Sequence, residues 1–198
     1  MISRTEMRSA WRRLNTVKTL TAQAERQLGG SSFPTAAPHR ATYLGSSTQK
    51  FLLAIEKLHL PYETTMADLG MGLGQICDVA PFKKVVGFEQ DEKLFAAAEQ
   101  IRGWLELDNV SFRCEDFLTA DLTGFDLLYF FKPFHAGFRE RMRERLLDTR
   151  PGTLIISNAA DVERQAIFGG DRFLRLFSLD EFMPVRSHIE KFTTYRRI

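Results

Sequence analysis

The sequence predicts an α/β fold in which a doubly wound, mainly parallel sheet is covered by helices on both faces. Short apolar runs alternate with longer amphipathic segments along most of the chain, as in repeated strand–helix units. A glycine-rich turn separates the first such run from the helix-compatible segment after it. The length of 198 residues suits one well-buried domain with an appendage and is too short for two full domains.

The N-terminal segment is expected to form an amphipathic, basic helix. Its apolar residues recur at spacings of three and four, the period of one helix face: Met7, Trp11, Leu14, Val17, Leu20, Ala24 and Leu28. Ser3 to Glu6 can supply a capping box, and Gly29 and Gly30 can end the helix. Residues 1–50 hold eight Lys and Arg against two Glu, a net charge of +6, whereas residues 51–198 hold nineteen against twenty-three Asp and Glu, a net charge of −4.

The cationic side chains of this helix are Arg4, Arg8, Arg12, Arg13 and Lys18. They permit binding to a nucleic acid, an anionic membrane surface or an acidic partner. We favour a helix that packs on its own domain and leaves its basic face in water, because its apolar stripe is continuous and its charge density is moderate. Nucleic acid is therefore a partner that the sequence allows but does not favour. The apolar stripe can also form a homodimer contact.

A regular series of elements follows this helix. Gly29 to Pro38 contains glycine, serine and proline, so we expect a loop that can act as a hinge or lid. Ser46 to Thr48 can cap the next helix, which carries Phe51, Leu52, Ile55 and Leu58 on one face. Strands are then expected at 65–67, 85–88, 110–113, 125–131 and 153–157, and helices at 75–80, 91–107, 136–148 and 161–168. Two last strands are expected around Val185 and over Lys191 to Arg196.

The glycine-rich turn is the strongest functional signal in the chain. Gly70, Gly72 and Gly74 alternate with apolar residues, and such a loop lets backbone approach a ligand closely. The next apolar run ends in Glu89, whose carboxylate can accept hydrogen bonds from a ribose diol. The pair predicts a nucleotide-type cofactor. A dinucleotide fingerprint requires a third glycine where Gln75 stands, which disfavours NAD.

The string Asp68-Leu69-Gly70-Met71-Gly72-Leu73-Gly74 resembles the first motif of class I S-adenosylmethionine-dependent methyltransferases. The resemblance spans about residues 43–198, and its motifs occur in the family's order. It implies a Rossmann-like sheet of seven strands with an antiparallel closing hairpin. It also implies S-adenosylmethionine as the cofactor, with Asp68 and the three glycines against its methionine part. We therefore expect residues 1–42 to form the helix with its hinge or lid, and residues 43–198 to form the methyltransferase domain.

The same resemblance assigns further cofactor contacts. Glu89 lies where the family's acidic residue binds the ribose hydroxyls. Asp116 lies where a carboxylate accepts from the adenine amino group, and Phe117 beside it is a further contact. In relatives the segment before the first strand often folds over the cofactor, so Tyr43 is a candidate contact as well.

The acceptor substrate is expected to meet the methyl group after the strand at 125–131. Amino-methylating members often carry Asn/Asp-Pro-Pro-Tyr/Phe there, and Phe131, Pro133 and Phe134 are the corresponding candidate substrate contacts. Lys132 replaces the family's hydrogen-bond acceptor with a cation, which favours a carboxylate, phenolate or phosphate near the reacting atom. His135 has the pKa range of a general base, so Lys132 and His135 are the candidate catalytic residues.

A second resemblance concerns the substrate. Gln75 and the string Glu115-Asp116-Phe117-Leu118 are similar to histone-lysine methyltransferases of the disruptor-of-silencing type and their small prokaryotic relatives. The Asn-rich acceptor strand of those histone enzymes is absent here, so a protein lysine is the less favoured substrate.

We therefore expect a methyltransferase that methylates oxygen or nitrogen on a small molecule or a protein side chain. Two alternatives are a non-enzymatic module that holds RNA or protein with its basic helix, and a nicotinamide-dependent oxidoreductase. No apolar run reaches the roughly 20 residues that cross a bilayer, and the N-terminus lacks a signal-peptide core, so we expect a cytoplasmic protein. Cys77 and Cys114 have no metal-ligand or disulfide spacing, so we expect two buried thiols and no metal.

Overall fold

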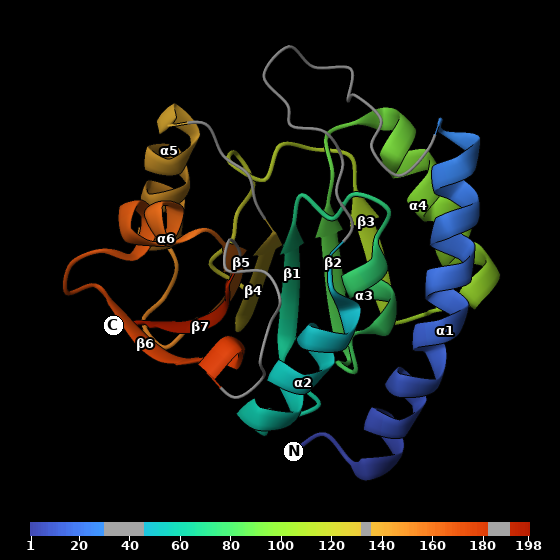
Figure 1. Cartoon of the computed structure of the whole chain (residues 1–198), viewed down its shortest axis with the longest axis horizontal. Helices are drawn as coiled ribbons and strands as arrows, with labels where there is room; N and C mark the ends of the chain where they lie inside the picture. Colours follow the sequence, from blue (N-terminus) through green and yellow to red (C-terminus); the bar gives the residue numbers. More distant parts are fainter. Residues whose placement is uncertain (30–45, 132–135, 182–190) are drawn as a thin grey trace.

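Seven strands form the sheet at the centre of the molecule. The structure is a computed structural model that describes residues 1–29, 46–131, 136–181 and 191–198. The strands are β1 (Thr65–Leu69), β2 (Lys84–Phe88), β3 (Val110–Arg113), β4 (Leu127–Phe131), β5 (Leu154–Ala159), β6 (Phe173–Ser178) and β7 (Lys191–Arg197). Their order is β3-β2-β1-β4-β5-β7-β6 (Figure 1). β1 to β5 are parallel and β7 is antiparallel to both neighbours, which confirms the predicted sheet.

The parallel strands create a switch point between β1 and β4. From β1 the chain passes through α3 (Gln75–Val79) to β2, and through α4 (Glu92–Leu105) to β3. It then returns to β4, which pairs with the other side of β1. The loops after β1 and β4 therefore diverge at the carboxyl edge of the sheet, and doubly wound sheets bind their ligands in such a crevice.

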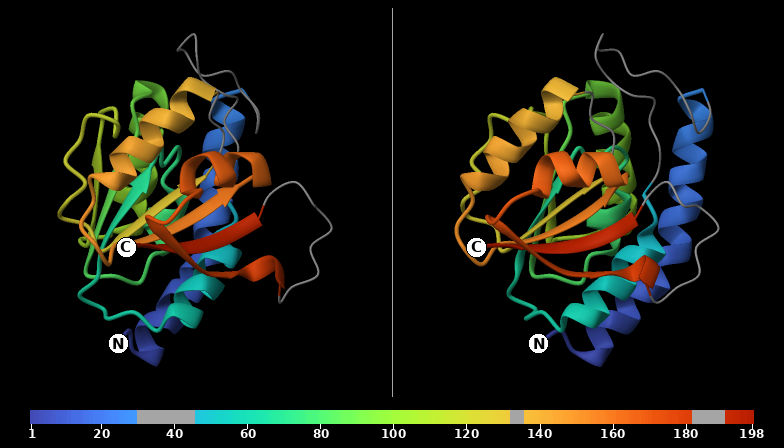
Figure 2. Two further views of the ribbon diagram at one scale, coloured as in Figure 1. Left: turned by 90° about the vertical axis from the view of Figure 1, so that its left-hand side faces the viewer. Right: turned by 60° about the vertical axis from the view of Figure 1, so that its left-hand side comes forward.

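Helices cover both faces of the sheet. α1 (Arg4–Gln27), α2 (Thr48–Leu58), α3 and α4 lie on one face, and α5 (Ala136–Leu147) and α6 (Asp161–Phe168) lie on the other (Figures 1 and 2). Tyr129 of β4 enters the core beneath the first group, whereas its neighbour Phe130 enters the core beneath the second. This alternation is expected of a strand that is buried on both faces.

α1 forms as the sequence predicts and is anchored along its length. Ser3 and Glu6 make the reciprocal hydrogen bonds of a capping box at its start. The buried residues of α1 pack against α2, α3 and α4: Ala10, Leu14, Val17, Thr21 and Ala24. The Trp11 Nε1–H donates to Glu56 of α2 at 2.7 Å. α1 is thus an outer layer on the sheet's own helices, while the division at residue 42 stays a prediction because residues 30–45 lie outside the described chain.

The strand β6 is the element that the sequence analysis did not predict. It pairs with β7 to form the closing hairpin, but the register shifts between Arg175 and Phe177. That irregularity breaks the apolar alternation by which strands are recognised, and Leu174 is half exposed. The strand expected around Val185 falls outside the described residues.

One cysteine also differs from expectation. Cys77 is buried, as predicted, but Cys114 is exposed. The reason is the position of β3 at the edge of the sheet, since Cys114 directly follows this strand. An edge strand has no neighbour on its outer side to cover the residues after it.

Asp78 of α3 makes the stability of the fold depend on pH. Its side chain is fully buried beside α1, and its carboxylate has no hydrogen-bond partner among the described residues. Burial raises its pKa to about 8, an effect that the nearby Arg13 and Arg102 oppose. The native state therefore keeps a proton that the unfolded chain loses near pH 4, so the free energy of unfolding falls as pH rises from about 4 to about 8.

We predict that Asp78→Asn flattens this pH dependence, because an amide does not titrate. The change should remove up to about 1.4 kcal/mol per pH unit from the slope. Asp68, whose pKa burial also raises to about 8, should supply the remaining slope of the same sign. Urea unfolding of both proteins across this pH range measures the effect, and equal slopes would mean that Asp78 is ionised in the native state.

Candidate functional site

The glycine loop folds back over the carboxyl end of β2. The φ angles of Gly70, Gly72 and Gly74 are 78°, 58° and 77°, in the left-handed region that favours glycine. The N–H groups of Gly70 and Met71 both donate to the Phe88 carbonyl, at 3.0 and 2.9 Å. The spacing of the glycines therefore encodes a tight turn after β1.

Glu89 lies against this loop. Its Oε2 accepts from the Gly72 N–H at 3.0 Å, and its Oε1 accepts from the Asp91 N–H at 2.8 Å. The side chain is almost buried, with an exposed fraction of 8%. These bonds bring the loop and the acidic residue of the next strand into direct contact and orient the carboxylate at the carboxyl edge.

Asp68 lies beneath the loop, near the end of β1. Its side chain is buried, and its Oδ2 accepts from the Cys77 thiol at 3.5 Å. Burial raises the pKa of Asp68 to about 8, the bond from Cys77 lowers it, and the charge of Glu89 raises it further. This environment favours the neutral form of the Asp68 carboxyl group.

Three side chains pack closely around the loop, namely Phe112 of β3, Met71 of the loop itself and Cys77 of α3. A Cβ atom at Gly74 would come within 2.8 Å of Phe112 Cζ. A Cβ atom at Gly87 of β2 would overlap Met71 Sδ and come within 3.0 Å of Cys77 Sγ. The sequence analysis missed Gly87 and Phe112, although a glycine inside an apolar strand is a known signal of close backbone approach.

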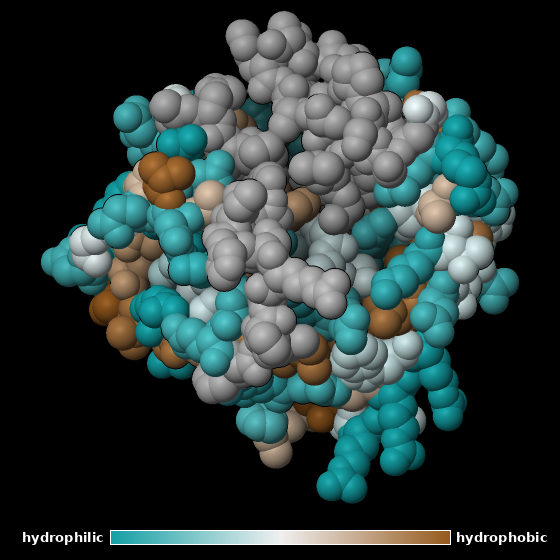
Figure 3. Space-filling view, viewed as in Figure 1, coloured by the Kyte–Doolittle hydropathy of each residue, from teal (hydrophilic) through white to brown (hydrophobic). Residues whose placement is uncertain are grey.

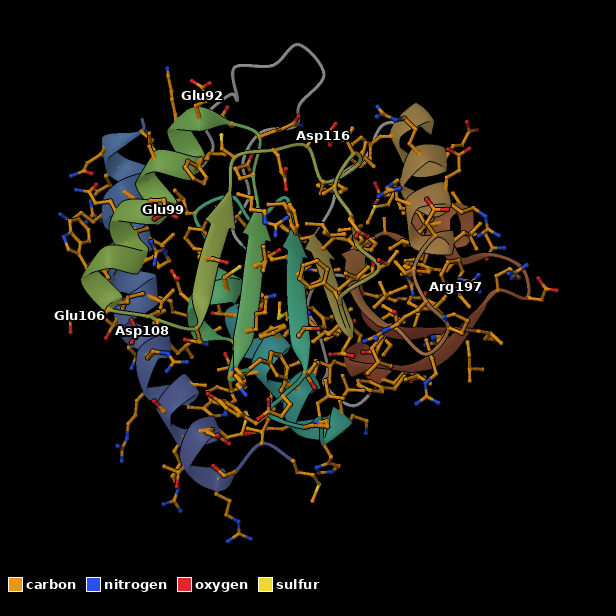
Figure 4. The ribbon with its side chains drawn as sticks, turned by 180° about the vertical axis from the view of Figure 1, so that it is seen from behind. Glu92, Glu99, Glu106, Asp108, Asp116 and Arg197 are labelled. Carbon is orange, nitrogen blue, oxygen red and sulfur yellow. The ribbon has the colours of Figure 1, made fainter. Side chains whose placement is uncertain are left out.

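Asp116 and Phe117 bring the loop after β3 to the same edge, where Figure 4 shows Asp116 above the carboxyl ends of the strands. The half-buried Asp116 accepts from the Leu118 N–H through Oδ1 at 2.9 Å. The Phe117 ring lies 3.9 Å from the position of a Gly70 Cβ and packs edge-on against Phe138 of α5. The structure thus brings together the loops that follow β1, β2 and β3.

The acceptor side of the site is described only in part. Phe131, at the end of β4, is half buried and pairs in register with Asn158 of β5. Asn158 is buried, and its Oδ1 has no hydrogen-bond partner in the described chain. The sequence analysis missed Asn158, a lone amide at the carboxyl end of an apolar strand. The remaining candidate residues lie outside the described chain: Tyr43, Lys132, Pro133, Phe134 and His135.

Within 1–29, 46–131, 136–181 and 191–198, no cluster of three His, Cys, Asp or Glu side chains is placed to hold a metal ion. None of the helices in these ranges is long and apolar enough to span a membrane.

We predict that Gly87→Ala destabilises the protein, because the added methyl group overlaps Met71 and crowds Phe112. Overpacking of this kind costs about 1–3 kcal/mol. Gly103→Ala in α4 is the matched control, since no atom lies within 4 Å of its added Cβ. Alanine in a helix should stabilise by up to about 1 kcal/mol relative to glycine. Thermal unfolding of both variants tests the packing, and equal melting temperatures would contradict it.

The fold is shared with solved methyltransferase structures, although the sequence matches no known family profile and no curated protein sequence. An RNA methyltransferase from Salinibacter ruber, in complex with S-adenosyl-L-homocysteine, is 19% identical over 78% of this chain and 94% of its own, with a TM-score of 0.60. A ribosomal protein L11 methylase from Lactobacillus delbrueckii subsp. bulgaricus is 17% identical over 78% and 80%, with a TM-score of 0.62. Magnesium protoporphyrin IX methyltransferase from Synechocystis, with bound S-adenosylmethionine, is 14% identical over 96% and 90%, with a TM-score of 0.62. The chain therefore has the Rossmann-like fold of these methyltransferases.

Proposed function

We propose that this chain is an S-adenosylmethionine-dependent methyltransferase that methylates an oxygen or nitrogen atom of a small molecule or a protein side chain. One observation carries the proposal: the Gly72 N–H donates to Glu89 where the loop after β1 meets the end of β2. In a doubly wound sheet this is the ligand-binding edge. The same fold holds S-adenosylmethionine or S-adenosyl-L-homocysteine in two of the structures above.

The residues at this edge suit the three parts of the cofactor. The loop from Gly70 to Gly74 has glycine at three of its five positions, which would let its backbone approach the methionine part closely. Glu89 would accept hydrogen bonds from the ribose hydroxyls. Asp116 would accept from the adenine amino group through Oδ2, because its Oδ1 already accepts from Leu118. Phe117 would supply an apolar surface beside the ring.

The bound cofactor would supply a methyl group on a sulfonium, which is transferred by in-line displacement. The chain must therefore align the acceptor with the donor and, where needed, remove a proton. Phe131 ends β4 and pairs in register with Asn158, one residue before the end of β5, and Asn158 Oδ1 would accept from the N–H or O–H of the acceptor. Lys132 and His135 directly follow β4 in the chain and remain the candidates for charge pairing and for the general base.

The competing functions make different predictions about ligands. An NAD-dependent enzyme would need a helix N-terminus for the pyrophosphate, but α3 has five residues and begins at Gln75 where a glycine is required. A non-enzymatic binding module would keep the fold and bind none of these cofactors. The resemblance to disruptor-of-silencing enzymes makes a protein lysine one acceptor to test.

We predict micromolar binding of S-adenosylmethionine and S-adenosyl-L-homocysteine in calorimetric titrations, and no binding of NAD. Glu89→Gln should weaken the binding of both sulfur ligands by about tenfold or more, because a charge-assisted hydrogen bond contributes roughly 1.5–3 kcal/mol. Glu92→Gln is the control, since Glu92 is exposed at the start of the neighbouring helix α4.

Equal affinity of Glu89→Gln and Glu92→Gln for the sulfur ligands would mean that Glu89 does not bind the ribose. Failure of the wild-type protein to bind either sulfur ligand would refute the proposed cofactor. Melting temperatures of all three proteins show whether a loss of binding reflects the site or the fold.

A further inference from the structure

The outer side of α1 carries a cationic surface that the proposed reaction does not use. We call it the basic face and define it by five exposed side chains: Arg4, Arg8, Arg12, Lys18 and Arg26. We propose that the basic face binds the phosphodiester backbone of a nucleic acid. This inference does not rest on methyl transfer, because the surface lies outside the candidate cofactor site.

The helix period places these five cations on one side of α1. At about 100° per residue they lie within roughly a third of a turn, opposite the buried stripe of Ala10, Leu14 and Val17. Arg13 belongs to another side, where its Nε–H donates to the Asp78 carbonyl at 3.1 Å. At about 1.5 Å per residue the basic face extends over roughly 33 Å.

The cations of the basic face are available to a ligand. None of the five makes a hydrogen bond or ion pair with another described residue. Of the two acidic residues of α1, Glu6 belongs to the capping box, and the partly buried Glu25 lies at the edge of the basic face beside Lys18. Arg4, Arg8 and Arg12 follow one another at i, i+4, where like charges repel and destabilise a helix by a few tenths of a kcal/mol per pair. The arrangement thus costs helix stability, whereas an anion along this row would neutralise the repulsion.

α1 presents this surface as a rigid element. Its hydrogen bond from Trp11 to Glu56 and the bond from the Ile2 N–H to the Leu60 carbonyl tie its first half to the domain. Its last turns pack with Leu73 of the glycine loop, so the basic face and the candidate cofactor site belong to one packed body. A preorganised surface loses little entropy when it binds.

The chemistry of the basic face favours a nucleic acid over a membrane or a protein. All exposed residues of α1 are polar, and hydrophilic side chains project where the helix begins (Figure 3). A membrane-bound helix needs an apolar face for the lipid, and protein interfaces need aromatic or apolar anchors. Arg and Lys interspersed with the exposed Asn15, Thr19 and Gln23 are instead the groups that contact phosphate and sugar.

Acidic side chains on the neighbouring helix α4 lie beside the basic face. Figure 4 shows Glu92, Glu99 and Glu106 along α4, which packs on α1. They disfavour binding of a polyanion on the α4 side of α1. The basic face is therefore bounded on that side.

We predict that the full-length chain binds fluorescein-labelled RNA or DNA strands of roughly 20 nucleotides, measured by anisotropy between about 50 and 200 mM salt. Arg4→Gln/Arg8→Gln/Arg12→Gln should weaken binding at least tenfold at low salt. It should also make the slope of log K against log salt shallower by about 2–3, since each lost phosphate contact removes roughly 0.7–0.9. Glutamine has a helix propensity close to that of arginine, so α1 should remain folded.

Two control variants separate this site from general charge. Lys84→Gln/Arg172→Gln/Arg196→Gln removes the same charge from exposed positions outside α1 and should leave binding unchanged. Arg4→Lys/Arg8→Lys/Arg12→Lys keeps the charge and should retain binding. The RNA and DNA arms show which backbone is preferred.

Three outcomes would overturn the proposal: no binding of the wild-type chain to either strand at low salt, equal losses in the two glutamine variants, or binding to phosphatidylserine vesicles alone. Calorimetry of the same variants with S-adenosylmethionine keeps this test separate from the proposed function. We expect the affinity for S-adenosylmethionine to be unchanged in all of these variants, because the basic face lies outside the candidate cofactor site.

Discussion

The candidate site depends on how closely the glycine loop approaches the end of β2. Two loop N–H groups share the Phe88 carbonyl, and a third binds the carboxylate of Glu89. Each such bond contributes only about 1 kcal/mol, but the geometry needs three left-handed residues and a strand glycine, Gly87, beneath Met71. This close approach fixes the direction of the Glu89 carboxylate and the position at which α3 begins. α3 in turn packs against α1.

That connection explains why α1 is more than an appendage. α3 is short, and the helix that covers it supplies Arg13 to its last turn and apolar side chains beside Leu73. Asp68 and Asp78 flank Cys77 in this region, and burial raises the pKa of both carboxyl groups to about 8. The layer behind the loop is therefore held by packing more than by charge, while the charge of α1 is directed outward.

The cofactor and acceptor sides of the site differ in how much structure they require. A cofactor with an adenine ring, a ribose and an amino acid part presents three distinct groups, so its proposed contacts come from three successive strand ends. Methyl transfer from a sulfonium is a displacement that mainly requires the acceptor to be aligned with the donor. Among the described residues the acceptor side offers Phe131 and the buried amide of Asn158, and many acceptors are compatible with these two groups.

The sequence by itself determined the α/β class, the limits of β3 and α6, the capping box of α1 and the glycine turn between β1 and α3. These features follow from local periodicity, capping residues and glycine spacing, which act over a few residues. Tertiary structure decided the rest, because it depends on what packs across the sheet. It placed β6 despite its irregular register, exposed Cys114 on an edge strand, and brought Phe112 onto Gly74. It also buried Asn158 at the end of a strand whose apolar sequence suggested only core, because a residue's neighbours across a sheet cannot be read from its neighbours along the chain.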